Sequence, residues 1–235
     1  MNDAAPAAVR WLPTDEALRT RRAVRKFLPT PVPREMIEEL LTLAARAPSG
    51  SNIQPWRVKV VAGDVRARIS RRIQQAIDTQ GMKAFTRTWQ YYPTKWFEPY
   101  AGRRRKLGWD LYGLLGIGKG EFAKSEAYRR ENYDFFGAPV GLFFTVHRDL
   151  EVGSWMDLGI FMSALMIAAR GRGLDTCPQA AFADFHSIVR DELAVPEEEI
   201  IIVGMALGHA DRDAVINRLQ TERAPLAETA TFHGF

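Results

Sequence analysis

Residues 47–56 read Ala-Pro-Ser-Gly-Ser-Asn-Ile-Gln-Pro-Trp, and an upstream segment, residues 21–27, reads Arg-Arg-Ala-Val-Arg-Lys-Phe. The upstream segment concentrates guanidinium groups, whose fixed fork of donors suits phosphate oxygens. The downstream segment places a proline turn, small hydroxyls and an amide beside a tryptophan. We therefore predict that the upstream segment holds a phosphate group and that the downstream segment holds a planar ring.

The two segments together resemble the signature of the FMN-dependent nitroreductase family, an Arg-x-Ser-x-Arg-x-Phe stretch followed by Ala-Pro-Ser-x-x-Asn-x-Gln-Pro-Trp. A third segment, residues 217–226 (Asn-Arg-Leu-Gln-Thr-Glu-Arg-Ala-Pro-Leu), is similar to the family's closing phosphate-binding run. The resemblance spans residues 20 to 235. It implies an α+β protein with the nitroreductase fold, in which helices flank a central, mainly antiparallel sheet. It also implies an intertwined homodimer with two FMN sites at its interface.

The length and charge of the chain fit a single enzyme-sized domain. A chain of 235 residues can bury a full core, and no Pro/Gly/Ser linker divides it. We expect a flexible lead-in over residues 1–14 and one FMN-binding domain over residues 15–235. Within this domain, residues 80–131 form a variable helical excursion near the substrate site, with an irregular middle around Pro93 and Pro99. The net charge of +4 is too balanced for a dedicated nucleic-acid binder.

Cysteine usage and hydropathy predict a cytoplasmic protein without a membrane span. The only cysteine, Cys177, excludes an intrachain disulfide, and the N-terminus lacks the order of a secretory signal. The most apolar helical stretch, residues 155–169, is interrupted by Asp157 and is shorter than the roughly 20 residues that a bilayer requires. No histidine is near Cys177 in sequence, so we expect that thiol to serve packing. The histidines have no metal-ligand spacing, and no metal site is expected.

Hydrophobic periodicity predicts the regular elements around these segments. The helix expected to begin at the N-cap Ser154 is apolar on nearly all sides. Such a helix should be buried in the core, in a dimer interface, or in both. The expected helices are 33–46, 65–79 and 154–170, and the expected strands are 58–62, 140–146 and 199–205.

For the FMN phosphate, the resemblance implies a triad of arginines from both ends of the chain, Arg21, Arg25 and Arg223. Each would contribute charge-assisted hydrogen bonds of about 1.5–3 kcal/mol; solvated surface arginine is the alternative. Ala23 stands where the family usually has a serine that donates to the phosphate, so one contact of about 0.5–1.5 kcal/mol should be missing. Arg22 compensates if it turns inward, although an extended segment would direct it away from Arg21.

For the flavin ring, the resemblance implies contacts from three places. The loop 47–56 would contact the isoalloxazine, commonly in the partner subunit's site, although a structural turn is the alternative. Residues 176–181 would pass over the flavin and supply a backbone amide near N5 or O4, unless they are only a helix-to-strand connection. Asn132 would reach the pyrimidine end, unless it caps the preceding helix. The candidate ring-contacting residues are Pro48, Ser49, Gly50, Asn52, Asn132, Pro178, Gln179, Ala180 and Ala181.

The segment from Trp89 to Tyr112 carries many aromatic residues around Arg103-Arg104-Arg105-Lys106. Its position matches the variable excursion that shapes substrate access in the family. Aromatic faces beside cations suit a flat, anionic substrate such as a nitrobenzoate, and an amphipathic cover with a solvated basic edge is the alternative. The candidate substrate-binding residues are Trp96, Arg105, Trp109 and Tyr112.

The resemblance thus implies an enzyme, an NAD(P)H-dependent flavin oxidoreductase. Hydride would pass from NADH or NADPH to flavin N5 and then to a nitroaromatic, reducing nitro to hydroxylamine by a ping-pong mechanism. Because this chemistry lies on the flavin, no catalytic protein residue is expected. The alternatives are the same chemistry on a quinone, an enone or a halogenated phenol, and a non-catalytic flavin-binding module.

Overall fold

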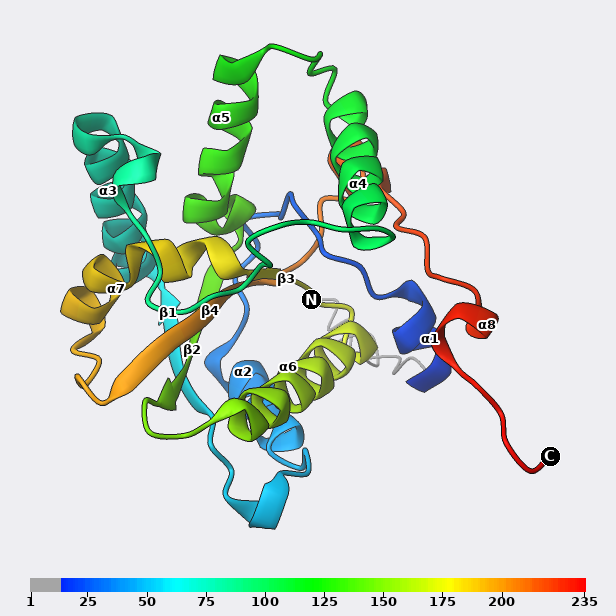
Figure 1. Ribbon diagram of the computed structural model, residues 1–235. Helices are drawn as coiled ribbons and strands as arrows, with labels where there is room; N and C mark the ends of the chain where they lie inside the picture. Colours follow the sequence, from blue (N-terminus) through cyan, green and yellow to red (C-terminus); the bar gives the residue numbers. More distant parts are fainter. Residues whose placement is uncertain (1–13) are drawn as a thin grey trace, which may run out of the picture.

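A central antiparallel sheet organises the protein, whose structure is a computed structural model that describes residues 14–235. The strand order is β1-β2-β4-β3, and every neighbouring pair is antiparallel (Figure 1). The expected α+β fold with a flanked antiparallel sheet is therefore confirmed. The strands are β1 Arg57–Ala62, β2 Val140–His147, β3 Asp175–Gln179 and β4 Glu199–Gly208.

Helices cover both faces of this sheet. One hydrophobic cluster joins α2 and α6 to one face, and another joins α3 and α7 to the opposite face. The helices within the described residues are α1 Thr14–Thr20, α2 Arg34–Ala44, α3 Gly63–Gln80, α4 Tyr100–Leu114, α5 Phe122–Arg130, α6 Val152–Gly171, α7 His186–Leu193 and α8 Leu226–Thr229. Short 3-10 turns, η1 Gly50–Asn52, η2 Met82–Ala84, η3 Glu131–Gly137, η4 Ala180–Phe185 and η5 Val215–Arg218, connect them.

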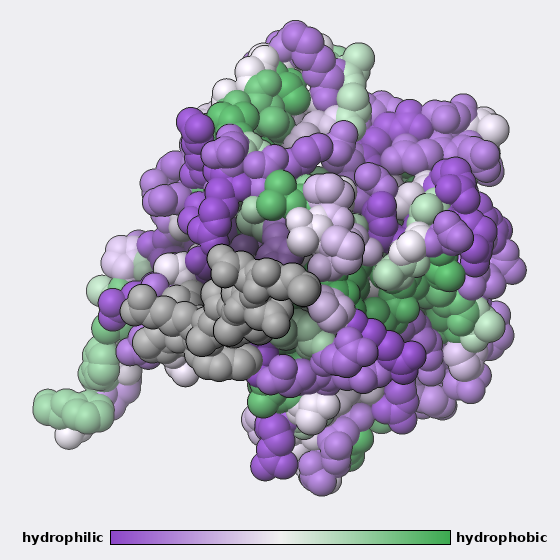
Figure 2. Space-filling view, turned by 180° about the vertical axis from the view of Figure 1, so that it is seen from behind, coloured by the Kyte–Doolittle hydropathy of each residue, from purple (hydrophilic) through white to green (hydrophobic). Residues whose placement is uncertain are grey.

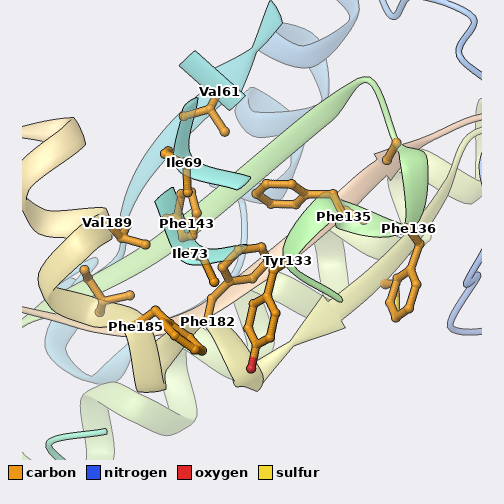
Figure 3. Close-up of a cluster of buried hydrophobic side chains, with 14 of the residues drawn as sticks. Val61, Ile69, Ile73, Tyr133, Phe135, Phe136, Phe143, Phe182, Phe185 and Val189 are labelled. Atoms are coloured by element: carbon orange, nitrogen blue, oxygen red, sulfur yellow. The ribbon is translucent and has the colours of Figure 1, made fainter. Parts of the chain in front are cut away.

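The alternation of side chains along β2 explains why the sheet has two cores. Leu142 and Phe144 pack with the α2 and α6 side, whereas Phe143 between them packs with the α3 and α7 side. Successive strand residues point to opposite faces, so a strand buried on both sides is apolar throughout. On the α3 and α7 side, Phe135 stacks on Phe182 with ring centroids 4.5 Å apart, and Phe143 meets Phe182 edge-on (Figure 3).

The edge strand β3 was not among the strands expected from the sequence, in which a helix-to-strand connection was only the alternative for residues 176–181. Pro178 lies within it and cannot donate a ladder hydrogen bond, but an edge strand tolerates proline. Among the described strands, only β4 pairs with it. On its other side, Ala23 forms an isolated parallel bridge with Thr176, and Phe27 at the end of the arginine-rich segment bridges to Ala210. The amide of Val24 donates to the carbonyl of Thr176 at 3.1 Å. The arginine-rich segment is thereby fixed beside β3.

The apolar helix α6 is longer than expected. It begins at Val152, so Ser154 is not its N-cap, and it spans 20 residues. Of the described helices, it alone has the length and hydropathy of a membrane span, so the length argument against a span is wrong. Its buried face, including Phe161 and Leu165, instead packs in the core with α2 and the sheet. Its other face exposes Val152 and Met156, so burial on most sides is not observed within one chain.

Residues 82–131 are helical only in their second half. Residues 85–99 contain no regular helix or strand, and α4 and α5 follow as two rods that project from the body on one side (Figure 1). Residues 1–13 of the expected lead-in lie outside the described residues, and Thr14 already begins α1.

The face opposite to that of Figure 1 is mostly hydrophilic, with scattered hydrophobic groups (Figure 2).

Candidate functional site

Both ends of the chain contribute to one arginine-lined cavity. It has a volume of about 430 Å³, and its lining includes Arg21 and Arg22 from one end and Arg223 from the other. Arg22 lines it although its Nη1 also donates to the carbonyl of Asn217 at 2.9 Å. Arg22 is exposed and also lines a second cavity with Arg170 and Asp175, so the inward turn that would compensate for Ala23 is not observed. With Arg19, four arginines contribute to the lining of the first cavity.

Arg25 is not part of this lining. The positive charge of Arg25 instead lowers the pKa of Tyr128 and of Cys177 in β3. Arg25 therefore lies further along the strand. Its Nη1 donates to the carbonyl of Ala23 at 3.3 Å. The predicted triad is therefore divided, with Arg21 and Arg223 at the cavity and Arg25 beside the edge strand.

Asn217 joins the two ends of the chain, a role that its sequence position did not reveal. Its Oδ1 accepts from the amide of Arg25 at 2.8 Å, and its Nδ2 donates to the carbonyls of Lys26 and Asp211, each at 2.7 Å. The side chain is buried, so these bonds satisfy an amide that would otherwise be costly to desolvate. Asn217 thus holds residues 22–26 against the C-terminal segment.

The end of β3 brings together Gln179 and Asn132, both predicted to lie near the flavin. Nε2 of Gln179 donates to the carbonyl of Asn132 at 2.7 Å, and Ala180 and Ala181 follow in η4. Nδ2 of Asn132 donates to the carbonyl of Arg129 at 3.0 Å, which is the helix-capping alternative. Pro178 is partly exposed on the strand. The small residues after Gln179 leave the backbone at the strand end open to close approach.

Two polar atoms in this region are buried without a hydrogen-bond partner, Oε1 of Gln179 and the hydroxyl of Tyr128. A third, Oγ1 of Thr176, lies on β3 itself. A buried polar atom that makes no hydrogen bond costs about 1–3 kcal/mol, so native structures contain few of them. Successive strand residues face opposite sides of a sheet, so Thr176 points away from the side of Gln179. The atoms of Gln179 and Tyr128 therefore indicate a place that a polar ligand completes.

The loop 47–56 has a strained backbone. Ser51, Asn52 and Gln54 all adopt left-handed conformations, with φ of 49°, 56° and 48°. Non-glycine residues in this region cost of order 1–3 kcal/mol each and persist where surrounding contacts impose them. Here Oγ of Ser49 accepts from the amide of Gln54 at 3.0 Å, and Nε2 of Gln54 donates to Oδ1 of Asn52 at 3.1 Å.

The base of this loop is fixed to α6. The amide of Gly50 donates to Oδ2 of the buried Asp157 at 3.1 Å, and Trp56 stacks on Phe161 at 4.8 Å. Trp56 therefore packs beneath the loop. Pro48, Gly50 and Asn52 are exposed, with Ser49 half-buried.

The loop is far from the arginine-rich segment within one chain. It lies at one end of the molecule, whereas residues 21–27 lie at its centre and α4 and α5 at the opposite end (Figure 1). One chain alone therefore does not bring its two predicted walls together.

The four predicted substrate residues fall into separate places. Trp96 packs on Tyr92, and Arg105 pairs with Glu98 at 2.7 Å on the surface. Trp109 and Tyr112 line a cavity of about 320 Å³ between α4 and the start of α5. Only the last two share a common space in this structure.

Nucleophilic and metal chemistry find no support among residues 14–235. Burial raises the pKa of the Cys177 thiol to about 11, so it remains a protonated packing group. No group of histidine, cysteine, aspartate and glutamate side chains in the described part could hold a metal ion.

Comparisons with known proteins agree on one family. A sequence model described as "Nitroreductase family" matches residues 18–209. A "4-nitrobenzoate reductase" of Nocardioides sp. (strain LMS-CY) is 40% identical over 219 residues, covering 93% of this chain and 89% of the relative.

Solved structures show the same relationship. The FMN and NADPH-dependent nitroreductase NfnB of Sphigopyxis sp. strain HMH has a TM-score of 0.92 and 36% identity, covering 95% of this chain and all of that one. NfnB of Mycobacterium smegmatis, solved in complex with NADPH, has a TM-score of 0.88 and 33% identity, covering 93% of this chain and 97% of that one. The chain belongs to the nitroreductase family.

Proposed function

We propose that this chain is an FMN-dependent oxidoreductase that passes hydride from NADH or NADPH, through the flavin, to a nitroaromatic acceptor. The observation that carries the proposal is the convergence of Arg21, Arg22 and Arg223 on one cavity beside β3. The similar proteins support it, because one is named a 4-nitrobenzoate reductase and two are described as FMN-dependent nitroreductases.

The residues present fit FMN. The arginine cavity suits a dianionic phosphate, since guanidinium groups form paired, charge-assisted hydrogen bonds to its oxygens. Further along β3, the unpartnered polar atoms of Gln179 and Tyr128 lie where a ligand with both donors and acceptors would satisfy them. A phosphate group joined to a polar, flat ring matches both parts.

Each part of the chain has a distinct role in this proposal. FMN, when bound, supplies the hydride acceptor and donor. Arg21, Arg22 and Arg223 hold its phosphate, and Arg25 places positive charge further along the strand. The backbone at Ala180 and Ala181 lies against the ring, and no side chain of this protein needs to act as an acid or base in the hydride step. Asn132 and Gln179 contact the polar edge of the ring.

We further propose that the active form is a homodimer in which loop 47–56 of one subunit completes the site of the other. The separation of the loop from residues 21–27 within one chain supports this arrangement (Figure 1). Beside the loop, α6 exposes an apolar stripe, in which Val152, Met156 and Ile160 are 73%, 64% and 44% exposed. A Met156→Asp variant, which places a charge on this stripe, should then elute as a monomer in size-exclusion chromatography and carry little flavin. We place this soluble enzyme in the cytoplasm.

The proposal is tested by the visible absorbance of the purified protein. Flavin bands should be present, bleach on anaerobic addition of NADH or NADPH, and return on addition of 4-nitrobenzoate. A colourless protein that takes up no FMN would overturn the proposal. Bands that bleach but return only with a quinone, an enone or a halogenated phenol would assign the same chemistry to another acceptor. Bands that neither cofactor bleaches would indicate a flavin-binding module.

A further inference from the structure

Tyr128 presents a buried hydroxyl to the region proposed to hold the flavin. It lies in the last turn of α5, and its ring meets Tyr112 of α4 edge-on with centroids 6.4 Å apart. On its other side lies Phe136, with centroids 6.3 Å apart. The ring is thus held by aromatic contacts, while its hydroxyl is buried and makes no hydrogen bond.

The backbone around Phe136 explains how this position arises. Phe135 and Phe136 both adopt left-handed conformations, with φ of 53° and 54°. Two successive bulky residues in this region are strained and require surrounding contacts to hold them. In this turn the Phe135 ring joins the buried aromatic group with Phe182, whereas the Phe136 ring points away from that group (Figure 3). Phe136 is thereby available as a support for Tyr128.

The charged and titratable groups that face the hydroxyl favour a donor. Burial raises the pKa of Tyr128 well above its usual value, and the nearby Arg25 lowers it by less. Cys177, Tyr112 and Glu131 raise it slightly further. The phenol therefore stays protonated at neutral pH and has a proton to donate. Within the described residues no acceptor receives it.

We propose that Tyr128 is a cofactor-binding residue whose hydroxyl donates a hydrogen bond to an acceptor atom of FMN beside Arg25. The inference rests on the proposed function, because FMN must occupy the side of β3 where Arg25 and Gln179 lie. Neither the arginine motif nor the loop motif includes this tyrosine, which belongs to the variable excursion. The cofactor would thus be bound partly by the segment expected to serve the substrate.

The test uses opposite effects of one substitution on the FMN-free and the FMN-bound protein. In Tyr128→Phe the FMN-free full chain loses a hydroxyl that has no partner, so its stability to urea should be unchanged or increased. FMN binding should weaken roughly two- to tenfold, because one neutral hydrogen bond is lost. Both quantities are measured on the same preparation, by urea denaturation and by quenching of FMN fluorescence on titration.

Tyr133→Phe is the matched control. Tyr133 is also buried in an aromatic environment, 4.7 Å from Phe185 between centroids, but the charged groups around its hydroxyl include Asp184 and Arg87 rather than Arg25. This variant should bind FMN as the wild type does.

Three results would overturn the inference. Unchanged FMN affinity in Tyr128→Phe would show that the hydroxyl does not contact the cofactor. The proposed function would stand in that case, because the wild-type chain still binds FMN. A loss of stability in the FMN-free variant would show that the hydroxyl has a partner within the protein. An equal loss of affinity in Tyr133→Phe would assign the effect to the aromatic core. A wild-type chain that binds no FMN would instead overturn the proposed function itself.

Discussion

The two motif segments, residues 21–27 and 47–56, are tied to distant parts of the chain, whereas the middle of the excursion is tied mainly to itself. In the motif segments, Arg22 and Arg25 bond to Asn217, and Gly50 bonds to Asp157. Each of these bonds joins residues more than 100 positions apart.

In the excursion, interactions between sequence neighbours predominate. Lys106 pairs with Asp110, Arg105 pairs with Glu98, and Tyr91 meets Tyr92 edge-on. Long-range anchors lie at its two ends, for example the double hydrogen bond from Arg87 to Asp184 and the pairing of Arg130 with Asp78. Two exposed ion pairs, Arg103 with Glu228 and Lys106 with Glu222, also join α4 to the C-terminal segment.

The comparison shows why the two regions can serve different purposes. A segment fixed by long-range bonds keeps its groups in one arrangement, as a cofactor that is always bound requires. A segment held through its ends and its own side chains can change its sequence without disturbing the sheet. We therefore expect cofactor affinity to depend on the motif segments and, apart from Tyr128, substrate preference to depend on the excursion.

The largest effect should come from removing two arginines of the first motif segment. Arg21→Ala combined with Arg25→Ala should give folded protein that binds FMN at least about 100-fold more weakly, because two charged contacts of about 1.5–3 kcal/mol each are lost. One is the contact of Arg21 with the phosphate, and the other is the contact of Arg25 with the part of FMN that lies further along β3. Flavin content after purification and the FMN dissociation constant measure this.

A matched control removes the same charge from the excursion. Arg103 pairs with Glu228, and Arg104 lies over the Trp96 ring at 5.0 Å. The double variant Arg103→Ala with Arg104→Ala should keep its FMN. Full flavin occupancy in the Arg21 and Arg25 variant would show that the phosphate lies elsewhere, and an equal loss in the control would show that net charge, not position, binds FMN.

Sequence reasoning worked where local chemistry decides the structure. The turn at Pro48 and the buried Trp56 follow from residue types that act over a few positions. It missed β3, because Pro178 is acceptable only in an edge strand and the edge is a property of the whole sheet. It also missed Asn217 and Tyr128, whose neighbours come from distant segments and leave no local pattern.

The segment before α4 shows the same limit. The sequence predicted helices with an irregular middle around Pro93 and Pro99, but the irregular stretch begins earlier, and residues 85–99 form no regular element. Trp89 instead donates from Nε1 to the carbonyl of Ile201 at 3.2 Å and meets Trp155 edge-on. Such tertiary contacts override the local preference of the chain.

An intermediate effect should follow from releasing the second motif segment. Asp157→Ala removes the acceptor of the Gly50 amide and should lower the free energy of unfolding by about 1–2 kcal/mol. The strained loop should then relax, and FMN affinity should fall with it. Asp157→Asn keeps an acceptor oxygen in place and should restore most of both quantities. Urea denaturation and FMN titration that match the wild type in Asp157→Ala would show that the loop needs no anchor on α6.

The smallest effect on stability should come from the excursion itself. Trp109 is 72% exposed, so Trp109→Ala should change the free energy of unfolding by less than about 0.5 kcal/mol and leave FMN affinity unchanged. If Trp109 contacts the acceptor, the KM for 4-nitrobenzoate should rise while reduction of the flavin by NADH or NADPH keeps its rate.

Trp89→Ala sharpens this test within the same segment. Trp89 packs on Trp155 and bonds to the sheet, so its loss should cost about 1–3 kcal/mol. Urea denaturation of the two variants separates a tryptophan that holds the excursion to the body from one that is free to meet a substrate. A Trp109 variant as unstable as the Trp89 variant would mean that the exposed ring is buried in the dimer, and the division between cofactor-binding and substrate-binding segments would then fail at this residue.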